Sequence, residues 1–223
     1  MTVLLVVLTI AIFLAIDYVR TRKALLKTAP GALTTAPSVA RVHPEYVSGF
    51  QLPANLRYHP GHTWALRESP TLVRVGVDDF ATRLIGTPES IALPKRGQWV
   101  RQGQKIFTVA KDGERAELVS PIEGEVTGVN EDVVKDPALL AKDPYGEGWF
   151  LTVMSPDAQT NLRNLLGGSL ARQWMADTAN RLHARMPMLA GAVAQDGGLA
   201  VHDLSTQLPE EQWSNLTREF FLT

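Results

Sequence analysis

The chain has 223 residues, which is enough for one modest domain with extensions. Its formal net charge of -1 at pH 7 gives no electrostatic reason to expect a nucleic-acid partner. It contains no cysteine, which excludes disulfides, thiolate catalysis and zinc sites built on sulfur.

Residues 1–23 are predicted to form a membrane anchor, because residues 2–16 are almost wholly apolar and residues 17–19 extend the run. About 18 helical residues span roughly 27 Å, which suffices for the hydrocarbon core of a bilayer. Basic residues follow only on the C-terminal side, so the positive-inside bias predicts a single pass through a bacterial inner membrane, with the N-terminus outside and the body cytoplasmic. The residues expected at the membrane interface are Tyr18, Arg20, Arg22 and Lys23. A cleaved signal peptide is the alternative, but the run lacks a positive n-region and a small-x-small cleavage site.

A tether and a β-rich domain are predicted to follow. Residues 24–49 are rich in Ala, Pro, Thr and Ser, a composition typical of a semi-extended tether. Residues 50–157 contain many short runs of period-two character separated by turn residues, which predicts a β-sandwich or barrel. One short helix is expected over residues 78–86, where Phe80, Ala81, Leu84 and Ile85 supply the apolar positions.

Residues 105–126 predict a hairpin followed by a third strand. Two short strands flank Asp112-Gly113. Asp-Gly between alternating runs favours a type I′ turn, because both central residues of that turn need φ > 0. Ser120-Pro121 and Gly124 then mark a Pro-x-x-Gly turn before the next strand.

The C-terminal part is predicted to be helical. Ser155-Pro156 suits the opening of a helical segment that covers residues 158–186, with a break or kink at Gly167-Gly168. The extension over residues 187–223 ends in a helix that starts at Pro209. One face of this helix is strongly apolar and must dock on its own domain or on a partner. The partner-binding candidates on that face are Trp213, Leu216, Phe220 and Phe221.

Five short motifs follow one another through residues 58–154. They are His62-Thr63-Trp64, Val-Gly-Val-Asp-Asp-Phe-Ala at 75–81, Leu-Pro-x-x-Gly-x-x-Val-x-x-Gly at 93–103, Glu-Gly-Glu-Val-x-x-Val-Asn at 123–130, and Asp-Pro-Tyr-Gly-x-Gly-Trp at 143–149. In order and spacing they resemble the glycine cleavage system H protein family. The resemblance implies a barrel-sandwich hybrid of two small β-sheets, so the expected fold class is mainly β with peripheral helices (α+β).

The same resemblance makes the hairpin tip the position of interest. Members of the family carry a lipoyl group on a lysine there, and alignment on Ser120-Pro121 puts that lysine at Gly113. Gly113 has no side chain and cannot form the amide, so no cofactor is expected at this position. Lys111 is the alternative attachment point for lipoate, and its expected cross-strand neighbour is Glu114.

No catalytic or metal site is expected elsewhere. His59 and His62 are spaced like a metal pair, but a Pro-Gly turn separates them and no third ligand is evident. Asp78-Asp79 is better explained as charge at a helix N-terminus. The glycine-rich runs lack the Gly-Lys-Ser/Thr of a phosphate loop. The sequence therefore predicts neither an enzyme nor a small-molecule substrate.

These features favour a non-catalytic accessory subunit anchored in the membrane. Its H-like domain is expected to dock onto integral membrane protein complex subunits, of a respiratory or photosynthetic assembly, because an anchor and tether raise the effective concentration of such neighbours. The alternative is a lipoyl carrier modified at Lys111 in one-carbon or sulfur metabolism. A periplasmic export adaptor also joins an anchor to a lipoyl-like sandwich. Such adaptors insert a long helical hairpin, for which this chain leaves no room.

Overall fold

The computed structural model describes residues 45–185 and 203–222. The predicted anchor over residues 1–23, its interface residues Tyr18, Arg20, Arg22 and Lys23, and most of the predicted tether lie outside these residues. In the part of the chain that is described, no helix is both long and apolar enough to cross a bilayer.

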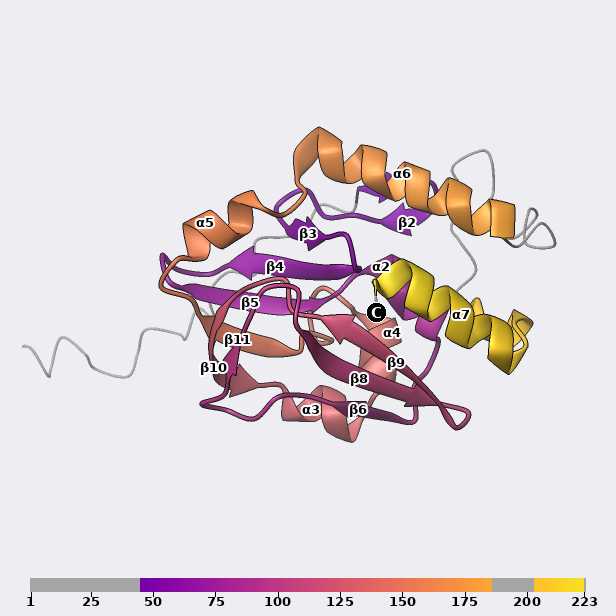
Figure 1. Cartoon of the computed structure of the whole chain (residues 1–223), viewed down its shortest axis with the longest axis horizontal. Helices are drawn as coiled ribbons and strands as arrows, with labels where there is room; N and C mark the ends of the chain where they lie inside the picture. Colours follow the sequence, from indigo (N-terminus) through magenta and orange to yellow (C-terminus); the bar gives the residue numbers. More distant parts are fainter. Residues whose placement is uncertain (1–44, 186–202, 223) are drawn as a thin grey trace, which may run out of the picture. The chain divides into compact units, whose positions relative to one another are not determined.

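A six-stranded antiparallel sheet with the strand order β3-β4-β5-β11-β10-β7 is the largest element (Figure 1). Its strands are β3 (Arg57–His59), β4 (Thr63–Arg67), β5 (Leu72–Val77), β7 (Trp99–Val100), β10 (Gly124–Val129) and β11 (Leu151–Met154). Val73, Val75 and Val77 alternate along β5 and are all buried, as the period of two requires for one face of a strand.

A second sheet has the order β6-β8-β9, with β6 (Ser90–Ala92), β8 (Lys105–Lys111) and β9 (Glu114–Val119). Phe107 of β8 and Phe150, which precedes β11, pack edge to face with ring centroids 5.1 Å apart. The two sheets therefore share one apolar core. A separate pair, β1 (Tyr46–Val47) and β2 (Phe50–Gln51), forms a two-stranded ribbon.

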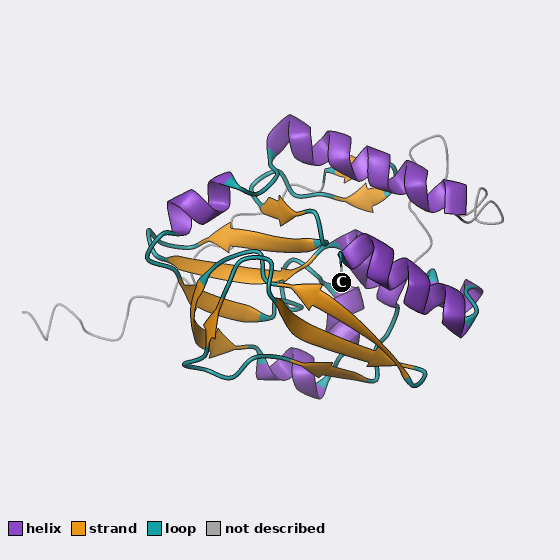
Figure 2. Ribbon diagram, viewed as in Figure 1, coloured by secondary structure: helices purple, strands orange, loops and turns teal. Residues whose placement is uncertain are grey.

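Helices lie around the sheets (Figure 2). They are α2 (Asp79–Ile85), α3 (Glu131–Lys135), α4 (Ala138–Lys142), α5 (Ala158–Arg163), α6 (Gly168–Arg185), the 3-10 helix η2 (Ser205–Gln207) and α7 (Glu210–Phe221). The predicted short helix is α2, whose N-cap Asp78 accepts a hydrogen bond from the Ala81 N–H at 2.8 Å. The predicted helical segment is two helices, and the second begins at Gly168, where the sequence indicates a break.

The expectation that Ser155-Pro156 opens a helix is wrong. Ser155 is buried, its N–H donates to the Thr71 carbonyl at 2.8 Å, and its hydroxyl makes no hydrogen bond. It therefore continues the pairing of the sheet past β11, and α5 begins only at Ala158.

The Asp-Pro-Tyr-Gly motif has a structural role. The Asp143 carboxylate accepts from the N–H groups of Gly146 and Glu147 at 3.0 and 3.1 Å. The Tyr145 hydroxyl donates to the Gln51 carbonyl at 2.6 Å and accepts from the Asp79 N–H at 2.9 Å. Burial holds the pKa of Tyr145 well above its usual range. The motif thus ties the start of α2 to β2 and shapes the core, and it has no need of a ligand.

The predicted fold class, mainly β with peripheral helices, is confirmed. The hairpin predicted around Asp112-Gly113 is the β8–β9 hairpin, with Lys111 paired to Glu114 across it. The terminal helix predicted after Pro209 is α7.

Candidate functional site at the hairpin tip

The tip of the β8–β9 hairpin is a two-residue turn. Asp112 has φ 51° and Gly113 has φ 83°, as a type I′ turn requires. Both residues are exposed, and a Cβ added to Gly113 would meet nothing within 4 Å. The apex of the hairpin is therefore open but presents no side chain at Gly113.

Lys111 stands one residue before the turn and points to the C-terminal segment. Its ammonium donates to the Ser205 hydroxyl and lies 3.7 Å from the Asp203 carboxylate. The Ser205 hydroxyl also donates to Asp203. The Lys111 side chain keeps only 13% of its surface exposed. The expected pairing of its ammonium with Glu114 is not what the structure records, because Asp203 takes that place.

Helix α7 packs along β9 and against α2, close to the hairpin (Figure 1). The Trp213 indole N–H donates at 2.8 Å to the carbonyl of Leu84, which lies in the last turn of α2. The ring of Phe220 packs at a tilt against Phe80 of α2, with ring centroids 5.0 Å apart, and a Cβ added to Gly61 would lie 2.8 Å from the Phe221 carbonyl oxygen. The helix thus lies directly against the backbone of its own domain.

The partner-binding candidates of α7 are all buried in this position. Their exposed fractions are 4% or less, for Trp213, Leu216, Phe220 and Phe221. Of the two docking sites that the sequence leaves open, the structure records the one on the chain's own domain.

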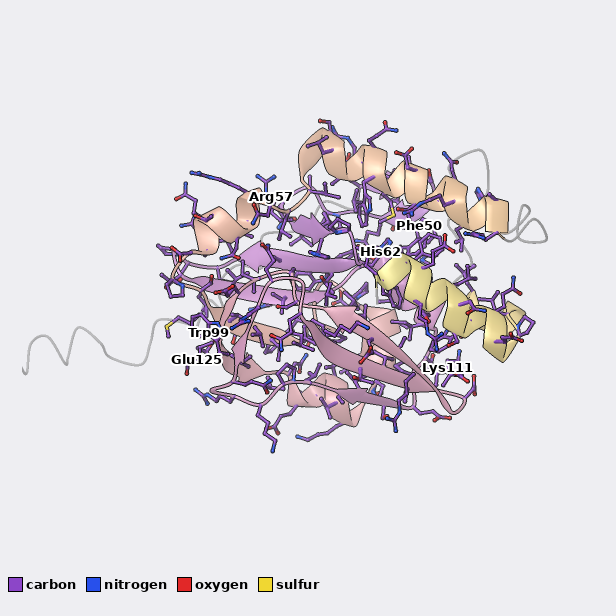
Figure 3. The ribbon with its side chains drawn as sticks, in the orientation of Figure 1. Phe50, Arg57, His62, Trp99, Lys111 and Glu125 are labelled. Atoms are coloured by element: carbon purple, nitrogen blue, oxygen red, sulfur yellow. The ribbon has the colours of Figure 1, made fainter. Side chains whose placement is uncertain are left out.

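His62 lies in a buried aromatic cluster beside α2 and α7 (Figure 3). Its Nδ1 is 2.8 Å from a carboxylate oxygen of Asp78, and its ring stacks on Phe80 at 4.2 Å and lies 4.7 Å from Trp174. Its Nε2 has no hydrogen-bond partner. Asp78 therefore holds His62 while it caps α2, which is a packing role.

His59 does not join His62 in a metal site. Its Nδ1 accepts from the Gly61 N–H at 3.0 Å and so shapes the turn between the two histidines. Burial and, second, the charge of nearby His62 lower the pKa of His59. Across residues 45–185 and 203–222, no three His, Cys, Asp or Glu side chains gather in a group that could hold a metal ion.

Two small sheets with a shared core and a hairpin that ends in a two-residue turn define a barrel-sandwich fold of the lipoyl-domain class. The family model described as "Glycine cleavage H-protein" matches residues 56–178. The chain belongs to the glycine cleavage H-protein family.

Two relatives agree with this assignment in sequence. The chain is 33% identical over 137 residues to the probable glycine cleavage system H protein 2 of Sulfurisphaera tokodaii, covering 60% of this chain and 92% of that protein. It is 36% identical over 107 residues to the glycine cleavage system H protein of Mycobacterium avium, covering 48% of this chain and 81% of that protein. A crystal structure of an H protein from Mycobacterium marinum aligns at 27% identity with a TM-score of 0.48, covering 57% of this chain and 98% of that one.

The predicted localisation, a single-pass protein of a bacterial inner membrane with a cytoplasmic body, is contradicted. The two relatives named above are glycine cleavage system H proteins, and this finding overturns the predicted location. The apolar run of residues 1–23 that suggested this location lies outside the described residues.

Asp203 and Ser205 are the residues of the site that sequence reasoning misses. Both contact Lys111 from the far end of the chain, and Ser205 is 94 positions away from it. No periodicity or motif links a lone Asp-x-Ser to a hairpin at that distance. The only usable signal is the short spacing between this pair and the aromatic helix that follows.

Proposed function

We propose that this chain is a non-catalytic H-protein-family module that acts by binding a partner protein and carries no lipoyl group at its hairpin apex. The observation behind this proposal is the position of Gly113, which stands at the apex of the turn with φ 83°. A residue without a side chain offers no amine for an acyl group at the place where the family resemblance expects one.

The residues present do not fit a lipoyl group in the arrangement described. Gly113 has no amine, and the amine of Lys111 is turned away from the apex into contact with Ser205 and Asp203. A largely buried, hydrogen-bonded ammonium is a poor target for acylation, because the modifying enzyme has little access to it.

A lipoyl carrier modified at Lys111 is the second candidate, and family membership favours it. The relatives bear the name of the glycine cleavage system H protein, so the comparisons support carriage more directly than docking. For this candidate Lys111 must leave Ser205 and Asp203 before its Nζ can form an amide. The two candidates therefore differ in one chemical property, the modification state of one lysine.

The division of the chain into domains is part of the same proposal. The H-like domain is taken to cover residues 50–157, with the helical segment 158–186 and the extension 187–223 as additions to it. The family match runs on to residue 178, within α6. That the partner is a subunit of an integral membrane complex stays a prediction.

Mass spectrometry of the full chain, purified from cells supplied with lipoic acid, tests the proposal. The expected mass is that of the unmodified chain. A partner protein is expected to co-purify with the chain at a constant molar ratio. A lipoyl increment on the peptide that contains Lys111 would replace this proposal with the carrier function.

A further inference from the structure

An open hollow of about 490 Å³ lies at the β3 edge of the six-stranded sheet, and three arginine side chains line it. They are Arg57 of β3, Arg67 of β4 and Arg163 of α5. All three are exposed. The labelled Arg57 lies far from Lys111 in Figure 3, so the hollow is separate from the hairpin tip.

Strand register explains why the arginines converge. Arg57 pairs directly with Ala65 across β3 and β4. Because alternate residues of a strand share a face, Arg67 points to the same face as Ala65, two positions earlier. Helix α5 then adds Arg163, with Leu162 beside it. Three elements thus each contribute an arginine to the lining of one hollow, together with Ala65 and Leu162.

No carboxylate neutralises this cluster within the described residues. Arg67 donates to the carbonyls of Ser69 and Pro70 at 3.2 and 3.3 Å, and none of the three arginines has an ion pair there. Other exposed cations of the chain do find partners, such as Lys105 with Glu117. Three unneutralised guanidiniums repel one another, and planar guanidinium matches the geometry of carboxylate oxygens in bidentate pairs.

We propose that this hollow binds an extended acidic segment of a partner protein. The arginines come from three elements that line an open hollow, so they suit several carboxylates spaced along a chain. Leu162, which is half-buried, can contact the aliphatic parts of such side chains. The chain's overall net charge is only -1, so the attraction is local to this site and is weakened by salt.

The partner segment binds through side chains and does not add a strand. The outer edge of β3 is already occupied, since the Tyr58 N–H donates to the Leu166 carbonyl at 2.9 Å and the Leu166 N–H donates to the Tyr58 carbonyl at 2.8 Å. Main-chain pairing with β3 at Tyr58 is thereby closed to another polypeptide.

Fluorescence anisotropy with a short labelled poly-glutamate peptide tests the proposal on the full chain. Saturable binding is expected at low salt, and the R67A/R163A variant is expected to weaken it by about tenfold or more, a difference that corresponds to about 1.4 kcal/mol. The matched control is R101A/R115A, which removes two exposed arginines outside the hollow and should change affinity less than about twofold. Thermal unfolding of each variant checks that the fold is intact.

Three outcomes overturn the proposal. The first is no saturable binding of the poly-glutamate peptide, and the second is an equal loss of affinity in the R101A/R115A control. The third is that another anion binds as well as the peptide. Inorganic phosphate that displaces the peptide at equal concentration would indicate a small-anion site. An oligonucleotide that binds as tightly as the peptide would indicate general polyanion binding. None of these results depends on whether Lys111 is modified.

Discussion

The ammonium of Lys111 lies 3.7 Å from the carboxylate of Asp203. This contact joins the tip of the β8–β9 hairpin to the segment that leads into α7. Ser205 completes the contact with its hydroxyl. The hairpin of this family member is therefore held by its own C-terminal segment at the one lysine next to the turn.

Releasing this contact should expose the Lys111 amine. In the D203N/S205A variant the reactivity of Lys111 toward an acetylating reagent should rise several-fold, because the ammonium loses the carboxylate charge of Asp203 and the hydroxyl of Ser205. The loss of stability should stay below about 1 kcal/mol, since the pair is partly exposed to solvent. Peptide mass spectrometry measures the labelling, with Lys105, 49% exposed, as the internal reference. An unchanged ratio of Lys111 to Lys105 labelling would show that Asp203 and Ser205 do not shield the amine.

Docking of α7 should depend on Trp213. The W213A variant is expected to lose about 3–5 kcal/mol of unfolding free energy, because it removes a buried indole and its hydrogen bond to the Leu84 carbonyl. Trp99 provides the control, since it is 51% exposed on β7 beside Glu125 (Figure 3). W99A should change the unfolding free energy by less than about 0.5 kcal/mol. Urea denaturation compares the two, and equal effects would argue against a well-packed α7.

Stability should fall as the pH drops below 6.5. The pKa of His59 is lowered from 6.5 in the folded state, first by burial and second by His62, so the unfolded chain binds this proton more readily. The part of the unfolding free energy that comes from neutral His59 is fully present above pH 6.5. It is lost as the pH falls toward the lowered pKa of the folded state, by at most about 1.4 kcal/mol per pH unit.

The H59N variant should flatten this part of the pH profile. An asparagine side-chain oxygen can accept from the Gly61 N–H in place of Nδ1, but it does not titrate. Urea denaturation above and below pH 6.5 compares the variant with the native chain. If both lose stability in parallel, another group carries the titration.

Local chemistry in the sequence accounts for much of the observed fold. Asp112-Gly113 predicts the hairpin because few residue pairs adopt φ > 0 at both turn positions, and both do so here. Asp78 predicts the start of α2 because a carboxylate can accept from the free N–H groups of the first turn. Ser155-Pro156 misleads because the same residues that suit a helix start also suit the end of a paired strand.

The candidate site is less predictable for a physical reason. The apolar face of α7 indicates that the helix must be covered, but it does not specify which surface covers it. The contact between Lys111 and Asp203 depends on that docking, and it therefore becomes visible only when the whole chain is folded. For the same reason the Arg57–Arg67–Arg163 hollow follows from strand register and the position of α5, which no local pattern encodes.

On the proposal above, the hairpin carries no lipoyl group because Gly113, which has no amine, stands at its apex. The space around Gly113 is open, so G113K can place an amine there at a cost of about 1–2 kcal/mol for a side chain at positive φ. Gly97 has φ 82° and equally open surroundings, which makes G97K the matched control for a new surface lysine.

Intact-mass measurement after co-expression with a lipoate ligase and lipoic acid is the most direct test. A lipoyl increment is expected on G113K, and none on the native chain or on G97K. A lipoyl increment on the native chain, located to the peptide with Lys111, would contradict the proposed function and establish this protein as a carrier.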